Sequence, residues 1–80
     1  MSHQPSIGRN VLFWRSGYEG ICLDAKQPMA AKIALVHNEQ CVNLSVTDHA
    51  GNVFPVSGVL LVQDGDAAPG QSRPWCEWMP

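Results

Sequence analysis

The fold is decided by Cys41–Val62, which has the sequence CVNLSVTDHAGNVFPVSGVLLV. Its first part alternates apolar and polar residues, a period of two that places Val42, Leu44 and Val46 on one face of a strand. The next residues, Asp48–Asn52, are types that tolerate positive φ or bond their own backbone, and they favour a turn. A second apolar run completes the stretch. Together these features predict an antiparallel β-hairpin.

An isolated hairpin is only marginally stable, so neighbouring segments must supply further strands. The apolar segments that can do so are Val11–Trp14, Met29–His37 and Trp75–Met79. Met29–His37 also suits a short helix, because Pro28 is favoured at a first helical position and alanine favours helix. A strand is the preferred interpretation, since a compact polar turn after His37 would place this segment antiparallel to the hairpin.

Two residues of the second apolar run shape the expected sheet. Gly58 predicts a bulge or bend, and Pro55 lacks an N–H group and belongs at an edge or at that bend. Five short strands with such bends predict an all-β fold, a small five-stranded antiparallel barrel of SH3-like type whose closure removes exposed edges. The alternative is an α+β fold with a short helix at 28–38. Residues 1–6 are expected to be a disordered N-terminus, and residues 7–80 a single domain.

A long connection, Gly17–Pro28, separates the first two expected strands. Ile21 and Leu23 lie two residues apart within it, and their side chains could pin part of this loop to the core. A second loop, rich in glycine and proline, is expected at Asp64–Pro74.

The composition describes a small domain with few charges. Eighty residues carry a formal net charge of −2 and only five lysine and arginine residues, none adjacent. Nucleic-acid affinity depends on neutralising phosphates, so this balance disfavours nucleic acid as a partner, unless folding gathers Arg9, Arg15 and Lys32 on one face. The longest apolar run, Val59–Val62, is too short to span a membrane. A domain this small has a thin stability margin, which leaves a homo-oligomer open.

The three cysteines and one histidine have the right chemistry for zinc. His37 and Cys41 are four residues apart and could form half a site, but Cys22 and Cys76 are isolated in the sequence. We therefore expect no metal, and thiols that pack as small hydrophobic groups. The odd number of cysteines indicates a reducing, cytoplasmic environment rather than a secreted disulfide framework.

A cysteine–histidine catalytic pair would need a base within reach, an orienting group and a pocket that excludes water. His49 lies in the predicted turn, where an exposed histidine without a role is expected. A barrel of this length has little room for such a pocket. The sequence therefore predicts no enzyme activity and no cofactor.

The aromatic residues are the best candidates for a functional surface. We expect Trp14 and one C-terminal tryptophan to lie in the core, and Tyr18 and the other tryptophan to be partly exposed. The candidate partner-binding surface is Tyr18, Trp75 and Trp78. Exposed aromatic rings on such barrels can dock proline-rich or extended peptides.

Several segments resemble short proteins encoded by tailed bacteriophages and prophages. These segments are Gly8–Leu12, Ala30–Ile33, Val42–Asp48, Gly51 and Trp75–Pro80. The resemblance implies a phage-derived protein in the cytoplasm of a bacterial host. Its motifs are strand and turn residues, so it carries over no functional residue. The sequence as a whole predicts a non-enzymatic accessory protein that acts through protein–protein contacts or self-assembly, with a nucleic-acid-binding barrel as the alternative.

Overall fold

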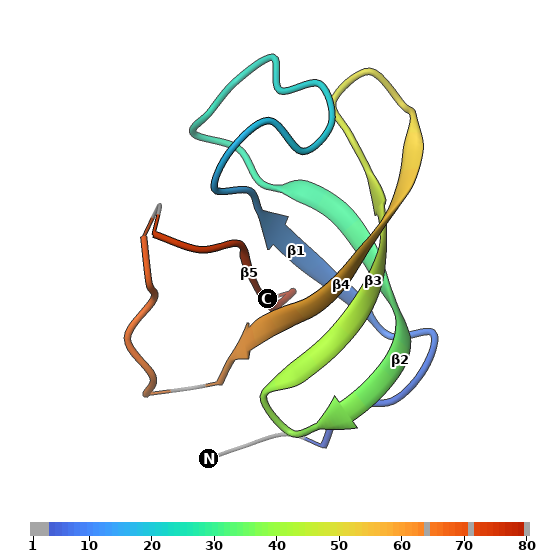
Figure 1. The fold of residues 1–80 in the computed structure, drawn as a ribbon, viewed down its shortest axis with the longest axis vertical. Coiled ribbons are helices and arrows are strands. Elements are labelled where there is room, and N and C mark those ends of the chain that lie inside the picture. The colour runs from blue at the N-terminus through green and yellow to red at the C-terminus, as the bar shows by residue number, and fades with distance from the viewer. Residues whose placement is uncertain (1–3, 64, 71, 80) are drawn as a thin grey trace.

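The computed structural model describes residues 4–63, 65–70 and 72–79. Five strands form a closed barrel in the order β1-β2-β3-β4-β5 (Figure 1). They are β1 (Asn10–Trp14), β2 (Met29–Asn38), β3 (Cys41–Thr47), β4 (Val53–Val62) and β5 (Trp75–Trp78). The described residues contain no helix, which confirms the all-β prediction. The alternative helix at 28–38 is wrong, because β2 occupies that segment and pairs with both β1 and β3.

One strand pairing differs from the antiparallel expectation. β5 runs antiparallel to β1 but parallel to β4, with Leu60 opposite Trp75 and Val62 opposite Glu77. A parallel neighbour requires a connection that returns to the starting end of the sheet, and the segment between β4 and β5 does this (Figure 1). The barrel therefore closes through one parallel and four antiparallel pairings.

The core consists of side chains that alternate along the strands, as the period of two predicts. Val42, Leu44 and Val46 of β3 are each no more than 1 % exposed. The remaining core residues come from the other four strands: Val11, Phe13, Met29, Ala31, Ile33, Val59, Leu61 and Cys76. Side chains at the intervening positions point outward, so the outer surface of the barrel is built from the other half of each strand.

Both special residues of β4 lie where the sequence indicates. The register of β3 and β4 shifts between Val42 and Leu44, and Gly58 at this bulge has a φ of 64°. The amide of Gly58 donates to Oδ1 of Asn43 across the bulge at 2.8 Å. Pro55 lies opposite Ser45 of β3, in the part of β4 that pairs with β3 but not with β5.

The prediction for residues 1–6 is only partly within the described chain. Residues 1–3 lie outside the described residues, whereas Pro5 is buried and the carbonyl of Ser6 accepts a hydrogen bond from the amide of Arg9. The amide of Gly8 donates to the carbonyl of Ile33 at 2.8 Å, so the chain is attached to β2 just before β1 begins.

Candidate functional site

The three predicted surface aromatics do not form one surface. Tyr18, in the connection after β1, is 96 % exposed. Trp75 stacks on Trp14, with ring centroids 5.6 Å apart. Trp78 lies at the other end of β5, packs against the core, and carries the guanidinium of Arg9 5.1 Å from its ring centroid. The rings therefore divide between the two ends of the barrel.

Trp14 is not a core residue, contrary to expectation. It faces outward from β1, and its indole Nε1 donates to Oε2 of Glu77 at 2.6 Å. Its neighbour Phe13 is fully buried in its place. Because side chains alternate along a strand, Phe13 and Trp14 cannot both enter the core, and the sequence does not say which one does.

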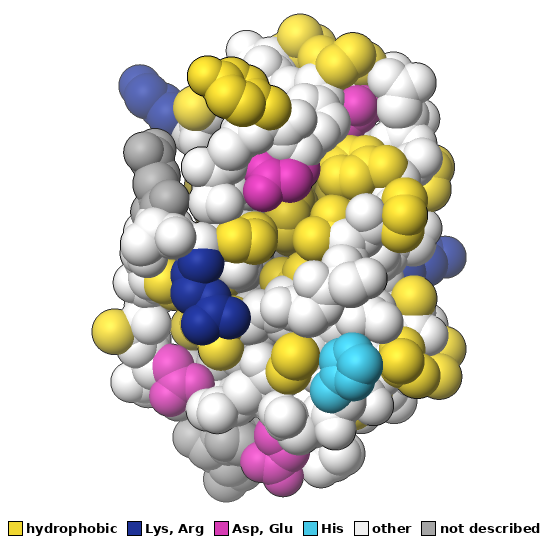
Figure 2. Space-filling model, in the orientation of Figure 1, with side chains coloured by type: hydrophobic (Ala, Val, Ile, Leu, Met, Phe, Trp, Pro, Cys, Tyr) yellow, Lys and Arg dark blue, Asp and Glu magenta, His cyan; other side chains and the backbone are white. Residues whose placement is uncertain are grey.

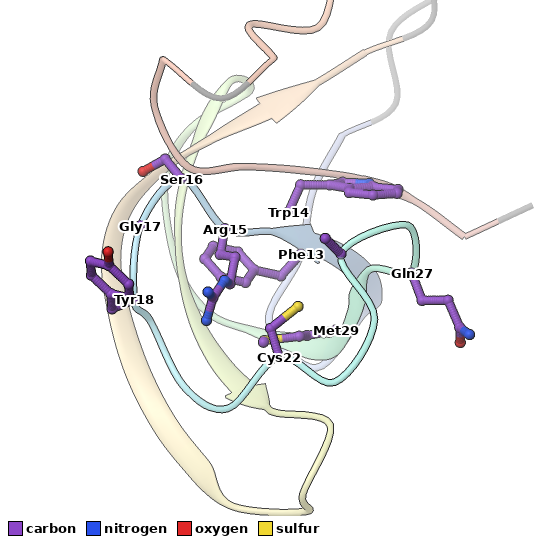
Figure 3. Close-up of a pocket in the computed structure, with 10 residues that line it drawn as sticks. Phe13, Trp14, Arg15, Ser16, Gly17, Tyr18, Cys22, Gln27 and Met29 are labelled. Carbon is purple, nitrogen blue, oxygen red and sulfur yellow. The ribbon is translucent and has the colours of Figure 1, made fainter.

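A pocket of about 330 Å³ lies at one end of the barrel, and we call it the loop pocket. It is formed by the end of β1, the connection that follows and the start of β2. Its lining residues are Phe13, Trp14, Arg15, Ser16, Gly17, Tyr18, Cys22, Ala25, Gln27 and Met29. Figure 3 shows the side chains of Arg15, Cys22 and Met29 directed into one space beside Phe13, while Tyr18 lies at the margin.

The connection that forms this pocket is held by its backbone rather than by its apolar side chains. Ile21 and Leu23 are 47 % and 74 % exposed, so the hypothesis that they pin the loop is wrong. The amide of Ile21 instead donates to Oδ2 of Asp48 at 2.9 Å, and its carbonyl accepts from the amide of His49 at 3.0 Å. The turn between β3 and β4 is therefore the anchor of the loop.

His49 has a structural role that the sequence does not indicate. Its Nδ1 accepts hydrogen bonds from the amides of Leu23 at 2.9 Å and Asp24 at 3.3 Å. Two donors at Nδ1 imply that the proton is on Nε2, which lies 3.3 Å from the carbonyl of Pro28 and can donate to it. His49 thus ties the middle of the loop and its end before β2 to the turn.

A second hollow, of about 370 Å³, crosses the outside of the barrel, and we call it the outer groove. Leu12, Ala30, Thr47 and Val53 lie opposite one another on β1, β2, β3 and β4, and together they form a continuous row across it. The other lining residues are Asn10, Val11, Ala31, Lys32, Ser45 and Met79. An adjoining hollow of about 400 Å³ shares two of these residues and is lined by Arg9, Asn10, Trp78 and Met79.

The outer groove has large exposed apolar side chains and cations at its border. Val53 is 68 % exposed and Met79 is 52 % exposed. Lys32 lines the groove and Arg9 lines the adjoining hollow, while the described residues that line either hollow include no carboxylate. Arg15 lies in the loop pocket instead, so folding gathers only two of the three cations considered from the sequence.

Charged side chains are also sparse in the middle of one face of the barrel (Figure 2). Figure 2 shows hydrophobic side chains gathered in the middle of the face that is turned toward the viewer in Figure 1, with few charges among them. Such a face is typical of proteins that contact other macromolecules.

The metal and thiol chemistry considered from the sequence does not converge on a site. All three cysteines are free, and His37 Nε2 lies 2.9 Å from Oδ1 of Asn43 rather than beside a thiol. Among residues 4–63, 65–70 and 72–79, no group of three or more histidine, cysteine, aspartate or glutamate side chains could hold a metal ion. Two of the thiols pack as the sequence predicts: Cys76 lies in the core, and the partly exposed Cys22 packs against it. Cys41 is also partly exposed.

The three thiols should differ in reactivity. Burial raises the pKa of Cys76 to about 12, which keeps its thiol protonated and unreactive at neutral pH. We expect a maleimide to label Cys22 and Cys41 in the native protein, and to label Cys76 only on unfolding. Mass spectrometry of peptides from native and urea-unfolded samples measures this. Native labelling of Cys76 at the rate of the other two thiols would contradict its burial.

Comparisons with other proteins leave the site to be interpreted from its own geometry. No family model matches the chain, and neither the curated proteins nor the solved structures include a significant match. No helix among the described residues has the length and apolar character needed to cross a membrane.

Proposed function

We propose that this protein is a non-enzymatic binding module that docks an extended segment of a partner protein in the outer groove. The observation that carries the proposal is the exposure of Val53 and Met79 around a concave surface. Apolar side chains that line a hollow lose contact with water when a partner fills it, and each square ångström buried is worth about 25 cal/mol. Scattered apolar residues on a convex surface would not give the same shape complementarity.

The charges at the groove define the kind of segment that fits. The whole chain has a formal charge of −2, yet Lys32 and Arg9 border these hollows without a lining carboxylate. An apolar segment that carries acidic residues would meet both the apolar surface and these cations. Opposite charges at the border of an interface steer partners and exclude wrongly charged ones.

The part of β4 around Pro55, which pairs with β3 but not with β5, is poorly suited to adding a partner strand. The amide of Asp48 donates to the carbonyl of Asn52, and hydrogen-bonded and non-hydrogen-bonded pairs alternate from there, so Pro55 and Ser45 form a non-hydrogen-bonded pair. The backbone nitrogen of Pro55 therefore faces the open edge, where it has no hydrogen to donate. Docking through side chains in the groove is favoured over strand addition at this edge.

A displayed library of random peptides, selected against the purified protein, tests the proposal. We expect the enriched peptides to combine apolar and acidic residues. Val53→Asp and Lys32→Glu should each weaken their binding at least about tenfold, because each places a carboxylate in the groove. Leu23→Asp is the matched control, since Leu23 is 74 % exposed on the loop after β1 and does not line the groove, and it should leave binding unchanged.

Three results would overturn the proposal. Enriched peptides could bind equally well to Val53→Asp, or they could lack acidic residues. Sedimentation could also show that the wild-type protein forms a dimer that Val53→Asp disrupts, in which case a second copy of the chain occupies the groove. The phage origin and cytoplasmic location expected from the sequence stay predictions.

The nucleic-acid alternative is tested by gel shift at low salt. Binding to B-form DNA scales with the number of phosphates that cations neutralise. Of the three cations considered from the sequence, all within the described residues, only Arg9 and Lys32 line adjoining hollows. We expect no retardation of single- or double-stranded oligonucleotides at micromolar protein. A complex that Arg9→Gln and Lys32→Gln abolish would favour the alternative instead.

A further inference from the structure

The loop pocket is separate from the outer groove and carries different chemistry. We propose that the loop pocket binds a carboxylate attached to an apolar group, with the guanidinium of Arg15 holding the carboxylate. The ligand class follows from three features: the hydrogen bonds that position Arg15, the absence of a carboxylate partner for it among the described residues, and the apolar residues beside it.

Arg15 is positioned by the loop that it helps to close. Its Nη1 donates to the carbonyl of Gly20 at 2.9 Å and lies 3.4 Å from the carbonyl of Glu19. A guanidinium has five N–H donors on three nitrogens, and these contacts involve one nitrogen. The remaining donors are held on a side chain that is already ordered and directed into the pocket (Figure 3).

Arg15 has no carboxylate partner among the described residues. Glu19 is close along the chain, but its Oε2 accepts from the amide of Gly17 at 2.9 Å and its Oε1 lies 3.4 Å from the hydroxyl of Ser16. The carboxylate of Glu19 therefore caps the loop, while Arg15 bonds backbone carbonyls. A partly buried guanidinium without a counter-ion attracts an anion, and carboxylates match its planar donors with two parallel hydrogen bonds.

The floor of the pocket beside Arg15 is apolar and already formed. Phe13, fully buried, and Met29, 2 % exposed, close the pocket from below, while the partly exposed Cys22 and the exposed Ala25 give a ligand apolar surface to contact. A volume of about 330 Å³ lies at the small end of the range for ligand pockets, which suits one ring or one apolar side chain. One guanidinium balances one negative charge, and the carboxylate of Glu19 on the same loop disfavours a doubly charged ligand such as phosphate.

Two sources share this chemistry. One is the C-terminal carboxylate of a peptide that ends in an apolar residue, and the other is a small free acid with an apolar ring. The two differ in size and in the presence of a peptide chain, so the same titration can distinguish them.

NMR titration of the ¹⁵N-labelled wild-type protein tests the proposal without any variant. The probes are phenylacetate with its neutral analogue phenylacetamide, and the tripeptide Ala-Ala-Phe with its C-terminally amidated form. We expect the acids to shift backbone amides of residues 15–20, Cys22 and Met29, and to bind about ten- to a hundredfold more tightly than the neutral forms, the usual effect of a charge-assisted hydrogen bond. Whichever of the two acids binds more tightly identifies the source of the ligand.

Variants then assign the effect to Arg15. Arg15→Gln should remove the preference for acid over amide, and Arg15→Lys should retain part of it because lysine keeps the charge but loses the planar donors. Arg73→Gln is the charge-matched control, since Arg73 is exposed and lines neither the loop pocket nor the outer groove, and it should leave the binding of both acids unchanged. The amide spectrum of each variant reports whether the barrel is folded.

The proposal is overturned if neither acid shifts these amides, if acid and amide bind equally to the wild-type protein, or if a folded Arg15→Gln keeps the preference. None of these results bears on the outer groove, whose test uses different residues and different ligands.

Discussion

Replacing Gly20 by alanine is expected to destabilise the barrel by about 2–4 kcal/mol. Gly20 has a φ of 71°, a conformation that L-residues with a Cβ atom rarely adopt. A Cβ atom there would lie 2.5 Å from Cε1 of Phe54 and 2.8 Å from Cβ of Asp48. Neither neighbour can move easily, because Phe54 packs against the core and Asp48 is only 6 % exposed.

Urea denaturation of a set of glycine variants measures this effect and separates its two causes. Gly58→Ala has the same backbone strain, with a φ of 64°, but no atom within 4 Å of its Cβ, so it should cost about 1–2 kcal/mol. Gly17 has no positive φ, and a Cβ atom there would lie 3.7 Å from its closest neighbour, Oε2 of Glu19. Gly17→Ala should therefore change stability by less than about 0.5 kcal/mol. If Gly20→Ala cost no more than Gly58→Ala, the close packing on Phe54 would be disproved.

The strands were predictable because their evidence is local. The alternation of Val42, Leu44 and Val46 requires no knowledge of the partner strand, and the three residues are buried as expected. The polar turn that follows β2 favours a strand over a helix there, and this signal is also local. Gly58 and Pro55 were placed correctly for the same reason, since each restricts the backbone at its own position.

The direction of β5 was not predictable in this way. Trp75–Trp78 could pair in either direction, and its parallel alignment with β4 depends on the path of the preceding loop. The attachment of the loop after β1 was missed because it depends on hydrogen bonds from a turn more than twenty residues away: Ile21 to Asp48, and Leu23 to His49. An exposed histidine in a turn gives no sign in the sequence that its ring accepts backbone amides.

The candidate sites depend even more on long-range register. The outer groove brings Leu12, Ala30, Thr47 and Val53 into one row through three strand pairings, each of which could shift by a residue. The aromatic signal identified Tyr18 and Trp78 as surface candidates but could not show that they lie in different hollows. Arg15 enters the sequence argument only as one of three cations that folding could gather, and nothing in the sequence indicates a pocket around it.

Asp48→Asn should weaken the end of the barrel that holds the loop pocket. The carboxylate accepts from the amides of Ala50 and Asn52 at Oδ1, and from the amide of Ile21 and Nδ2 of Asn52 at Oδ2. All four partners are donors, so an asparagine side chain can satisfy one oxygen position but must direct its own NH₂ group at the other. We expect Tm to fall by about 5–10 °C, and hydrogen exchange of the Ile21 amide to accelerate.

The same carboxylate should make stability depend on pH. Hydrogen bonds, above all from the amide of Ile21, hold the pKa of Asp48 below its ordinary value of 3.8. Its contribution is therefore complete above that value and is lost as the pH falls through the lowered folded-state pKa. The amide of Lys26 lowers the pKa of Asp24 in the same way, so acid also weakens the loop itself.

Urea denaturation between about pH 5 and pH 2 should show a shallower loss of stability for Asp48→Asn than for the wild-type protein, because the variant has one less depressed carboxyl to protonate. Glu39→Gln is the matched control, since it removes one carboxylate from an exposed turn and should leave the wild-type slope in place. The slope that remains in Asp48→Asn should decrease further when Asp24→Asn is added. If Asp48→Asn kept the full wild-type slope, the hydrogen bonds from the loop would not depend on the charge of Asp48, and the turn would hold the loop through His49 instead.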